Sequence, residues 1–368
     1  MRACLAAIAV AVALGAAGCR DAVPVPPLPR SSDADLLART EEARATLAPG
    51  ADAFLTAALD TLEQHSAWTG ADWLAVRAAA FERARNAREA ADAYPAVRAA
   101  LHDIGERHGG LHEAALRITP DGQRLDPNGS PTPPDPVVKA LPAGIGYAAF
   151  PPFPDPGGNG AEAYAQRIHD RIAAVDRSPR CGWVLDLRQD AGDDLFTQLA
   201  AAGPLLGEGR AGYFVDPRGA ADASAIDSVA ADTSGVAFAE FGYAAGRATA
   251  AGFGHAGVAG PTRLPQRYPN VAVLIGPETK SAGEALAVAF KARPKARLFG
   301  APTAGAATLL AYAELPDGSW LAYSSLVYAD RTGRRHVPNV RPDVEASAPP
   351  GRVPREATRW LRSRPECQ

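Results

Sequence analysis

Lysine is scarce in this sequence of 368 residues. It occurs only at Lys139, Lys280, Lys291 and Lys295, and arginine supplies the remaining positive charge. The formal net charge is −3 and the pI is near 6.2, so no basic excess exists and nucleic acid is not an expected partner. Any reaction that depends on a lysine side chain therefore has few candidates.

Cysteine is equally rare, with Cys4, Cys19, Cys181 and Cys367 as its four positions. None of them forms a CxxC pair or has the spacing of a metal site. For Cys181 and Cys367 the favoured interpretation is a small apolar residue or a free thiol. A long-range disulfide is the alternative.

Long apolar runs are absent after the N-terminus, so no later transmembrane helix is expected. The run at 3–17 is short for a membrane span but suits a signal segment. It ends in Ala-Ala-Gly-Cys at 16–19, which resembles a bacterial lipobox, although Ala16 replaces the usual Leu. We expect Cys19 to be lipidated and to begin the mature chain. Ordinary signal cleavage near Gly18 is the alternative.

The composition divides the chain into six segments. Apolar residues make up 47% of it, enough for a sizeable core. Helical spacing at 52–65, 72–85 and 94–107 predicts a small helical domain. The predicted segments are a lipoprotein signal peptide (1–19), a Pro-rich tether (20–32), an N-terminal helical domain (33–117), a Pro-rich crossover (118–144), the core (145–350) and a C-terminal tail (351–368).

The core alternates between predicted strands and helices, which indicates an α/β fold. The interval 216–270 is long and rich in Gly and Ala, and it is expected to hold an irregular loop that covers a site. Gly252, Gly254 and Gly257 fit a dinucleotide fingerprint, but no predicted strand precedes them and no helix follows. The expected strands are 145–150, 182–187, 212–215, 271–275, 296–299, 308–314 and 320–327, and the expected helices are 161–175, 194–206 and 282–292.

Ser281 is the leading candidate nucleophile. It follows a predicted buried strand and a tight turn, and it opens a helix whose N-terminal N–H groups are free. Ser281 and Glu284 also form the pattern of a capping box, and spacing alone favours that structural interpretation. The turn is not a G-x-S-x-G elbow, because Thr279 occupies the first glycine position.

Two further segments contain candidate catalytic groups. A hydrophobic strand ends in a charged turn with Gly192, which can present a backbone N–H to an oxyanion or simply lead into a capped helix. His108 lies in Gly-Glu-Arg-His-Gly-Gly at 105–110, where it is either a general base on a loop or an ordinary surface histidine. His108 and His112 hint at a metal pair, but Gly109 and Gly110 interrupt the helix that would align them.

Taken together and in this order, these segments resemble the tail-specific (C-terminal-processing) serine peptidase family, whose core also occurs in tricorn protease. The segment 144–153 resembles the family's G-Y strand. Asp186, Leu187 and Arg188 with Gly192 resemble its D-L-R-x-N-x-G-G turn, and 279–284 resembles its nucleophile turn. The segments 299–305 and 328–344 resemble its closing segments.

The resemblance implies a crotonase-like α/β core with an N-terminal helical domain, Ser281 as the nucleophile and no cofactor. Processing members use a lysine base, but Ala306 occupies that position here. The resemblance therefore implies the tricorn-like branch without a PDZ domain, in which His108 is the base. Gly192 and Ala282 would form the oxyanion hole, and Glu284 would orient the site or cap the helix.

Four residues depart from the family pattern, namely Gly109, Asp190, Asp193 and Arg341. The expected function is a serine-type endopeptidase for envelope proteins or peptides, lipid-anchored at the periplasmic side of an outer membrane. A secreted or soluble periplasmic protein is the alternative location. The alternative functions are a decayed peptidase that binds peptides and a metallohydrolase built on His108 and His112.

Overall fold

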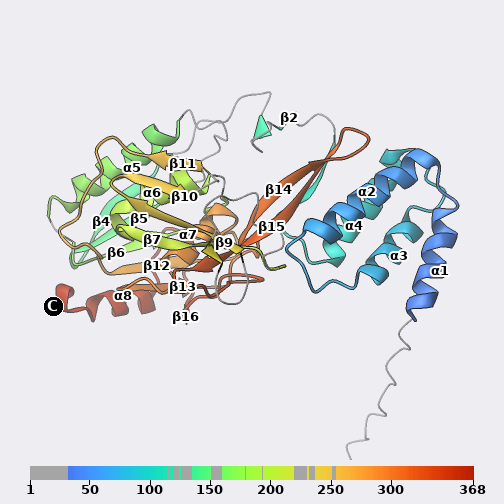
Figure 1. The fold of residues 1–368 in the computed structure, drawn as a ribbon. Helices are drawn as coiled ribbons and strands as arrows, with labels where there is room; N and C mark the ends of the chain where they lie inside the picture. Colours follow the sequence, from blue (N-terminus) through green and yellow to red (C-terminus); the bar gives the residue numbers. More distant parts are fainter. Residues whose placement is uncertain are drawn as a thin grey trace, which may run out of the picture.

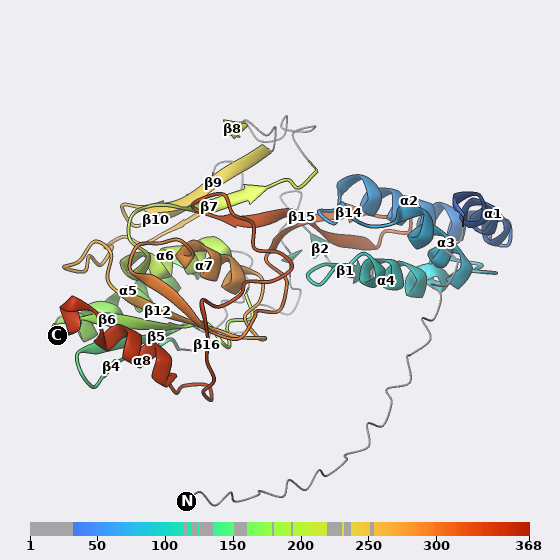
Figure 2. The ribbon, with the colours of Figure 1, turned by 90° about the horizontal axis from the view of Figure 1, so that it is seen from below.

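The computed structural model describes residues 32–113, 117–118, 124–125, 135–150, 160–178, 180–192, 194–218, 230–231, 237–250 and 254–368. The predicted signal segment, Cys19 and most of the tether lie outside these residues, as does Asp193. Figures 1 and 2 show an α/β body and a separate group of helices, with a long β-hairpin running between them.

The N-terminal helices pack around their own apolar core. Ser32 and Asp35 cap the first helix with reciprocal hydrogen bonds, and Asp72 accepts from the Ala75 N–H at 3.1 Å to cap the third. Phe54 is fully buried among these helices. The elements are α1 (Asp33–Arg44), α2 (Pro49–His65), α3 (Trp73–Arg83), η1 (Ala90–Ala93) and α4 (Tyr94–Asp103).

A six-stranded sheet forms the centre of the α/β body. Its strands run parallel except for β4, which pairs antiparallel with β5. The order is β16-β13-β12-β6-β5-β4. The strands are β4 (Val137–Leu141), β5 (Ile145–Ala149), β6 (Gly182–Asp186), β12 (Val271–Ile275), β13 (Ala296–Gly300) and β16 (Val344–Glu345).

Helices cover both faces of this sheet, which explains why β6 and β12 are buried along their whole length. One face packs against α5 (Ala161–Asp176), α6 (Leu195–Leu206) and α7 (Ala282–Phe290). The other face packs against α8 (Arg355–Arg362) through Ala357 and Leu361. Each fully buried large aliphatic side chain of this core contributes about 1.5–3 kcal/mol.

A second sheet lies on the far side of α6 and α7, and its strands are antiparallel. Phe214, Phe241 and Tyr328 join it to the common core, with ring centroids 5.1–6.4 Å apart. Its strands are β1 (Gly110–His112), β7 (Gly209–Val215), β8 (Ala230–Ala231), β9 (Ala237–Ala244), β10 (Arg247–Ala250), β11 (Gly254–Gly257), β14 (Thr308–Glu314) and β15 (Trp320–Asp330). A separate two-stranded sheet pairs β2 (Arg117–Ile118) with β3 (Arg124–Leu125).

The β14–β15 hairpin connects the two bodies. Its distal residues Leu315, Leu321 and Tyr323 are buried in the core of the helical domain, while β15 pairs with β7 of the α/β body. The strand β1, which follows the helices, pairs with the same hairpin at Gly110–Ala322. The turn that carries His108 directly precedes β1 and is therefore held against this hairpin. Figure 2 shows β1 beside β15.

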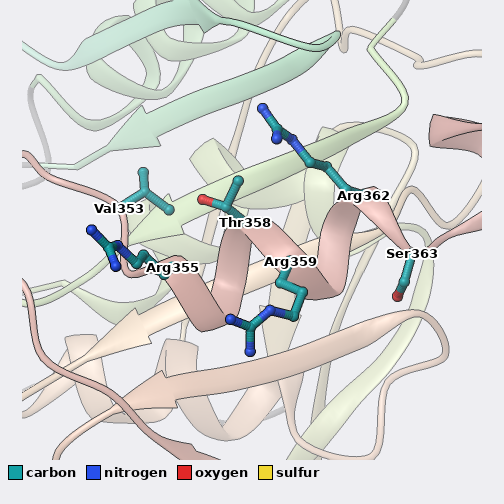
Figure 3. Close-up of a pocket in the computed structure, with 6 residues that line it drawn as sticks. All are labelled: Val353, Arg355, Thr358, Arg359, Arg362 and Ser363. Carbon is teal, nitrogen blue, oxygen red and sulfur yellow. The ribbon is translucent and has the colours of Figure 1, made fainter.

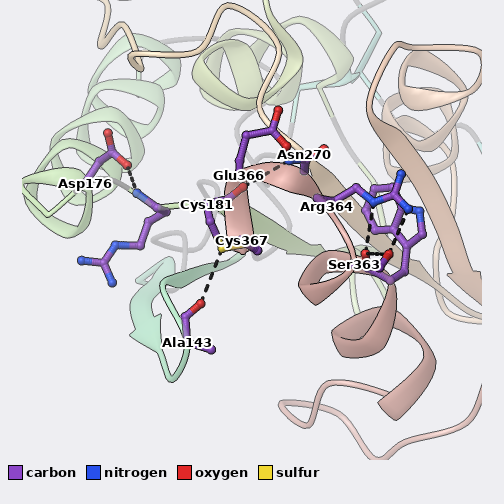
Figure 4. The surroundings of a disulfide bond; sticks show 10 residues. Ala143, Asp176, Cys181, Asn270, Ser363, Arg364, Glu366 and Cys367 are labelled. Carbon is purple, nitrogen blue, oxygen red and sulfur yellow. Dashed lines mark hydrogen bonds between the residues drawn. A yellow bond between two sulfur atoms is a disulfide. The ribbon is translucent and has the colours of Figure 1, made fainter.

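A disulfide joins Cys181, beside β6, to Cys367 in the C-terminal η3 (Pro365–Cys367). The favoured prediction of free thiols was therefore wrong. Beside the disulfide, Glu366 accepts a hydrogen bond from Asn270 at 2.9 Å (Figure 4). Glu366 also pairs with Lys295. Sequence spacing could not reveal this pairing, because the two cysteines are 186 positions apart in the sequence and only the fold brings them together.

The strand and helix predictions for the core are confirmed with small shifts of their ends. The largest differences are β7, which begins at Gly209, and β15, which continues to Asp330. The interval 216–270 contains three strands that were not predicted, because β9, β10 and β11 pair there as antiparallel strands, whereas 258–270 is irregular as expected. Gly254–Gly257 is thus a strand in a hairpin, and no helix follows it.

Candidate active site

The turn that carries Ser281 is fixed to two neighbouring strands. Thr279 donates its hydroxyl to the Leu187 carbonyl at 2.7 Å and accepts from the Gly276 N–H at 3.0 Å. Ser281 itself has φ 50° and ψ −118°, a rare conformation for a residue with a side chain. Such strain costs about 1–3 kcal/mol and is concentrated at active sites. The turn therefore presents a half-buried hydroxyl at the start of α7.

Glu284 connects the nucleophile turn to the segment 303–306. Its buried carboxylate accepts from the Ser281 N–H at 3.2 Å and the Thr303 hydroxyl at 2.5 Å. It also accepts from the N–H groups of Gly305 and Ala306 at 3.0 and 2.6 Å. Burial raises the pKa of Glu284, while these four donors favour its ionised form. Glu284 both caps α7 and holds the turn in place.

The Gly192 turn packs directly against Ser281. A Cβ at Gly192 would lie 2.7 Å from Ser281 Cβ and 3.2 Å from the Ala282 nitrogen, and its φ of +104° also favours glycine. Within the described residues the Ala282 N–H has no acceptor. The Gly192 N–H instead donates to Asp190 Oδ1 at 3.0 Å. The two predicted oxyanion donors are thus neighbours, but only one is available in this conformation.

His108 lies on a turn between α4 and β1. Glu106 closes the turn by accepting from the N–H groups of His108 and Gly109, each at 2.8 Å. A Cβ at Gly109 would lie 2.2 Å from the Ala322 carbonyl oxygen, so the close approach to β15 requires glycine there. Gly109, which departs from the family pattern, thereby allows His108 to lie against the hairpin.

A chain of hydrogen bonds links the His108 ring to Glu106. The ring Nδ1 lies 2.9 Å from Thr308 Oγ1, which lies 2.8 Å from Ser324 Oγ. The Ser324 hydroxyl in turn donates to Glu106 Oε1 at 2.9 Å. We call Glu106, Ser324, Thr308 and His108 the relay.

The ionised acid at its end sets the direction of the relay. Because the Glu106 carboxylate can only accept, the Ser324 hydroxyl must donate to it and must accept from Thr308. The Thr308 hydroxyl then accepts from His108, so the ring proton of the neutral imidazole sits on Nδ1. The lone pair lies on Nε2, which has no hydrogen-bond partner among the described residues.

Burial and hydrogen bonding shift the pKa values of both ends of the relay. Burial would raise the pKa of Glu106, but donors from Gly109, Ser324, His108 and Trp68 outweigh burial and lower it. Burial lowers the pKa of the His108 imidazole, although the charge of Glu106 opposes this. His108 is therefore neutral near pH 7, as a general base must be.

The segment 303–308 lies between the two catalytic candidates. Gly305 and Ala306 bond to Glu284 on the Ser281 side, and Thr308 bonds to His108. The Ala304 N–H also donates to the Thr279 carbonyl at 3.1 Å. Among the described residues, no hydrogen bond joins the Ser281 hydroxyl directly to the His108 ring.

All four lysines have contacts that lead away from Ser281. Lys280 is 4.0 Å from Glu278, and Lys291 pairs with Asp343 at 2.6 Å. Lys295 pairs with Glu366, and Lys139 lies 5.0 Å from the centre of the Tyr147 ring. Ala306 is buried at the family's lysine position. These contacts give no support to a Ser–Lys mechanism.

The described residues offer neither a metal site nor a membrane-spanning helix, and a pocket beside α8 lies apart from the candidate catalytic residues. In the part of the chain that is described, no group of three His, Cys, Asp or Glu side chains is arranged to hold a metal ion, so His108 and His112 gain no further ligand. No helix there is long and apolar enough to cross a membrane. A pocket beside α8 contains none of the candidate catalytic residues and is lined by Val353, Arg355, Thr358, Arg359, Arg362 and Ser363 (Figure 3).

Sequence reasoning missed most of the relay. Glu106 stands two residues before His108 and offered a local signal, because a carboxylate at that spacing can close a turn. Thr308 and Ser324 gave no signal, because they are more than 190 residues from His108 and come together only through the hairpin.

Comparison with known families matches residues 144–346 to peptidase family S41. This span covers more than half of the chain and contains Gly192, Ser281 and Glu284. The chain belongs to peptidase family S41, and it is a serine-type peptidase whose substrates are peptides or proteins. A search of curated proteins finds no match to this sequence.

Solved structures share the fold at low sequence identity. A lipoprotein from Streptococcus agalactiae is 16% identical with a TM-score of 0.57, and the alignment covers 86% of this chain and 97% of that one. A putative peptidase from Parabacteroides merdae is 15% identical with a TM-score of 0.51, covering 80% and 89%. The photosystem II D1 C-terminal processing protease is 15% identical with a TM-score of 0.48, covering 79% and 92%. The predicted crotonase-like α/β core with a helical N-terminal region is confirmed.

Proposed function

We propose that this peptidase hydrolyses peptide bonds with Ser281 as the nucleophile and His108 as the general base. Ser281 Oγ attacks the carbonyl carbon, and its proton passes to His108 Nε2. The C–N bond then breaks as the leaving amine takes that proton. Water, deprotonated by the same nitrogen, hydrolyses the acyl-enzyme and restores Ser281.

The relay is the observation that carries this proposal. It keeps a proton on Nδ1 of His108, leaves the lone pair on Nε2, and connects a buried anion to the imidazolium that forms. No direct Ser281–His108 hydrogen bond is present among the described residues. We expect substrate binding to form it, since catalytic hydrogen bonds are often long or unformed in free enzymes. Glu284 positions Ser281 and does not contact His108.

The Ala282 N–H would stabilise the oxyanion, joined by the Gly192 N–H when its peptide turns away from Asp190. Ala282→Pro removes the free donor at the first position of α7, where helices accept proline. We expect turnover to fall about 10²–10³-fold, while Ala282→Gly retains it. Equal turnover of the proline and glycine variants would exclude Ala282 as a donor.

One observation favours a second candidate function, a decayed peptidase that holds peptides without cleaving them. The Gly192 N–H is occupied by Asp190, at the position where the family usually has Asn. A fluorophosphonate probe separates the two functions, because it labels only an activated serine. Labelling of Ser281 supports the peptidase, and peptide binding without labelling supports the binding module.

We also propose that Cys19 is lipidated and anchors the protein at the cell envelope. The Cys181–Cys367 disulfide supports an oxidising compartment of this kind. Cys19→Ala should release the protein from membranes, whereas Cys4→Ala, in the apolar run, should not. A wild-type protein that already fractionates as soluble would contradict the anchor.

A further inference from the structure

Arg107 is an exposed arginine directly before His108. Other arginines of the helical domain pair with carboxylates, namely Arg44, Arg77, Arg83, Arg85 and Arg98. Within the residues that the structure describes, Arg107 makes no ion pair and no hydrogen bond. Within that part of the chain, the charge of Arg107 therefore does not stabilise the fold through an ion pair.

The backbone around Arg107 is fixed by the turn that also fixes His108. Glu106 accepts from the N–H groups of the two residues after Arg107, each at 2.8 Å. The arginine thus projects from a defined point beside the candidate base, and little backbone entropy remains to be lost when it binds a ligand.

The Arg107 side chain lies across Gly305. A Cβ at Gly305 would be 3.1 Å from Arg107 Cδ and 3.4 Å from its Nη1. The Gly305 N–H donates to Glu284, whose other oxygen accepts from the Ser281 N–H. The guanidinium is therefore separated from the nucleophile turn by one glycine and one carboxylate side chain.

The neighbouring carboxylates of the protein already have their partners. Glu106 accepts from three backbone N–H groups, the Ser324 hydroxyl and the Trp68 indole. Glu284 accepts from four donors of its own. Neither carboxylate forms an ion pair with Arg107, and no other carboxylate among the described residues does, so this guanidinium is available to an anionic ligand there.

We propose that Arg107 binds a carboxylate of the peptide substrate, so that the enzyme selects peptides with a negative charge near the cleaved bond. The inference rests on the proposed function, because it places the substrate at Ser281. A guanidinium matches a carboxylate with two parallel hydrogen bonds and is specific for that geometry. The charge comes either from an acidic side chain or from the end of the peptide chain.

The test compares matched peptides on matched variants. One pair differs by Glu against Gln beside the cleaved bond, and a second pair by a free against an amidated C-terminus. For wild type we expect kcat/KM to favour the charged member of one pair about tenfold, as one charged hydrogen-bonded contact allows. Arg107→Gln should remove the preference, Arg107→Glu should reverse it, and Arg107→Lys should keep part of it. Arg88→Gln, at another exposed arginine of the helical domain, should change nothing.

A general electrostatic role is distinguishable from recognition. If Arg107 only offsets the charges of Glu106 and Glu284, then Arg107→Gln lowers kcat/KM for both members of a pair equally, and the proposal is overturned. The same follows if wild type shows no preference in either pair. The pair that shows the preference identifies the source of the carboxylate.

Affinity measurements test this inference independently of the catalytic proposal. The affinity of Ser281→Ala for fluorescent versions of the four peptides is measured with and without Arg107→Gln. A charge preference that depends on Arg107 supports the site even if wild type cleaves nothing. Equal affinities for all four peptides overturn it even if wild type is an active peptidase.

Discussion

Thr308→Val removes one hydroxyl from the middle of the relay at nearly constant volume. That hydroxyl lies 2.9 Å from His108 Nδ1 and 2.8 Å from Ser324 Oγ. After the substitution, the Nδ1–H of a largely buried ring has no acceptor, and the imidazolium formed during catalysis loses its connection to Glu106. Hydrogen bonds to charged groups contribute about 1.5–3 kcal/mol. Since about 1.4 kcal/mol is a tenfold change, kcat should fall roughly 10–100-fold.

The assay measures kcat and KM for one peptide across pH, with active sites counted by a serine-selective probe. Thr308→Ser retains the hydroxyl and should keep most of the activity, while KM stays nearly constant in both variants. Because burial lowers the pKa of His108, wild-type activity should fall only below the usual histidine value of about 6.5. A hydroxyl that accepts from Nδ1–H favours the imidazolium, so the loss of the Thr308 hydroxyl should move the acidic limb to still lower pH.

The result that refutes this reasoning is a Thr308→Val enzyme with kcat within about twofold of wild type. A lower melting temperature alone would show only that the hydroxyl stabilises the fold. An equal loss in Thr308→Ser would indicate a packing defect, since the relay is intact in that variant.

Three further predictions concern the support of the site. Gly109→Ala should lower both activity and melting temperature, because its Cβ would lie 2.2 Å from the Ala322 carbonyl oxygen, whereas Gly70→Ala, with open space around it, should lower neither. Cys367→Ser should lower the unfolding free energy by about 2–5 kcal/mol, and an added reductant should abolish this difference from wild type. His169 is buried, its pKa is lowered by burial, and its ring contacts the Ala200 carbonyl and the Thr262 N–H. Its folded pKa lies below the unfolded value of about 6.5, so this stability is complete above pH 6.5 and is lost as pH falls below it. Between pH 7.5 and pH 5, urea unfolding should show a larger loss for wild type than for His169→Gln, and equal losses would contradict the assignment.

The parallel sheet was predictable because its pattern is local. The segments 182–187 and 271–275 are short apolar runs bounded by turn residues, and both became fully buried strands. Ser281 was found for a related reason, since a strand, a turn and a helix start are consecutive in sequence. Ser281 alone could not be distinguished from a helix cap, and in the structure its turn has both features.

The remaining parts of the site depend on contacts that no local pattern encodes. In the sequence, Thr308 and Ser324 look like ordinary strand residues. Only the pairing of the hairpin strands places their hydroxyls between His108 and Glu106. The occupied Gly192 N–H depends on where the Asp190 carboxylate turns, which the motif does not specify. Strands β10 and β11 were missed because they consist mostly of Gly and Ala and contain few of the β-branched and aromatic residues typical of strands. Strand β9 contains three aromatic residues, but it lies within a Gly- and Ala-rich interval that was interpreted as a whole.

The most direct test of Ser281 and His108 as the catalytic pair is the rate at which a fluorophosphonate probe modifies Ser281, followed by peptide mass mapping. The relay predicts an adduct on Ser281 in wild type, a rate that falls as pH drops below about 6.5, and at least a 10²-fold slower reaction in His108→Ala. Lys280→Ala and Lys291→Ala should react at nearly the wild-type rate. A fast Ser281 adduct in His108→Ala, or its loss in a lysine variant, would contradict the proposed mechanism.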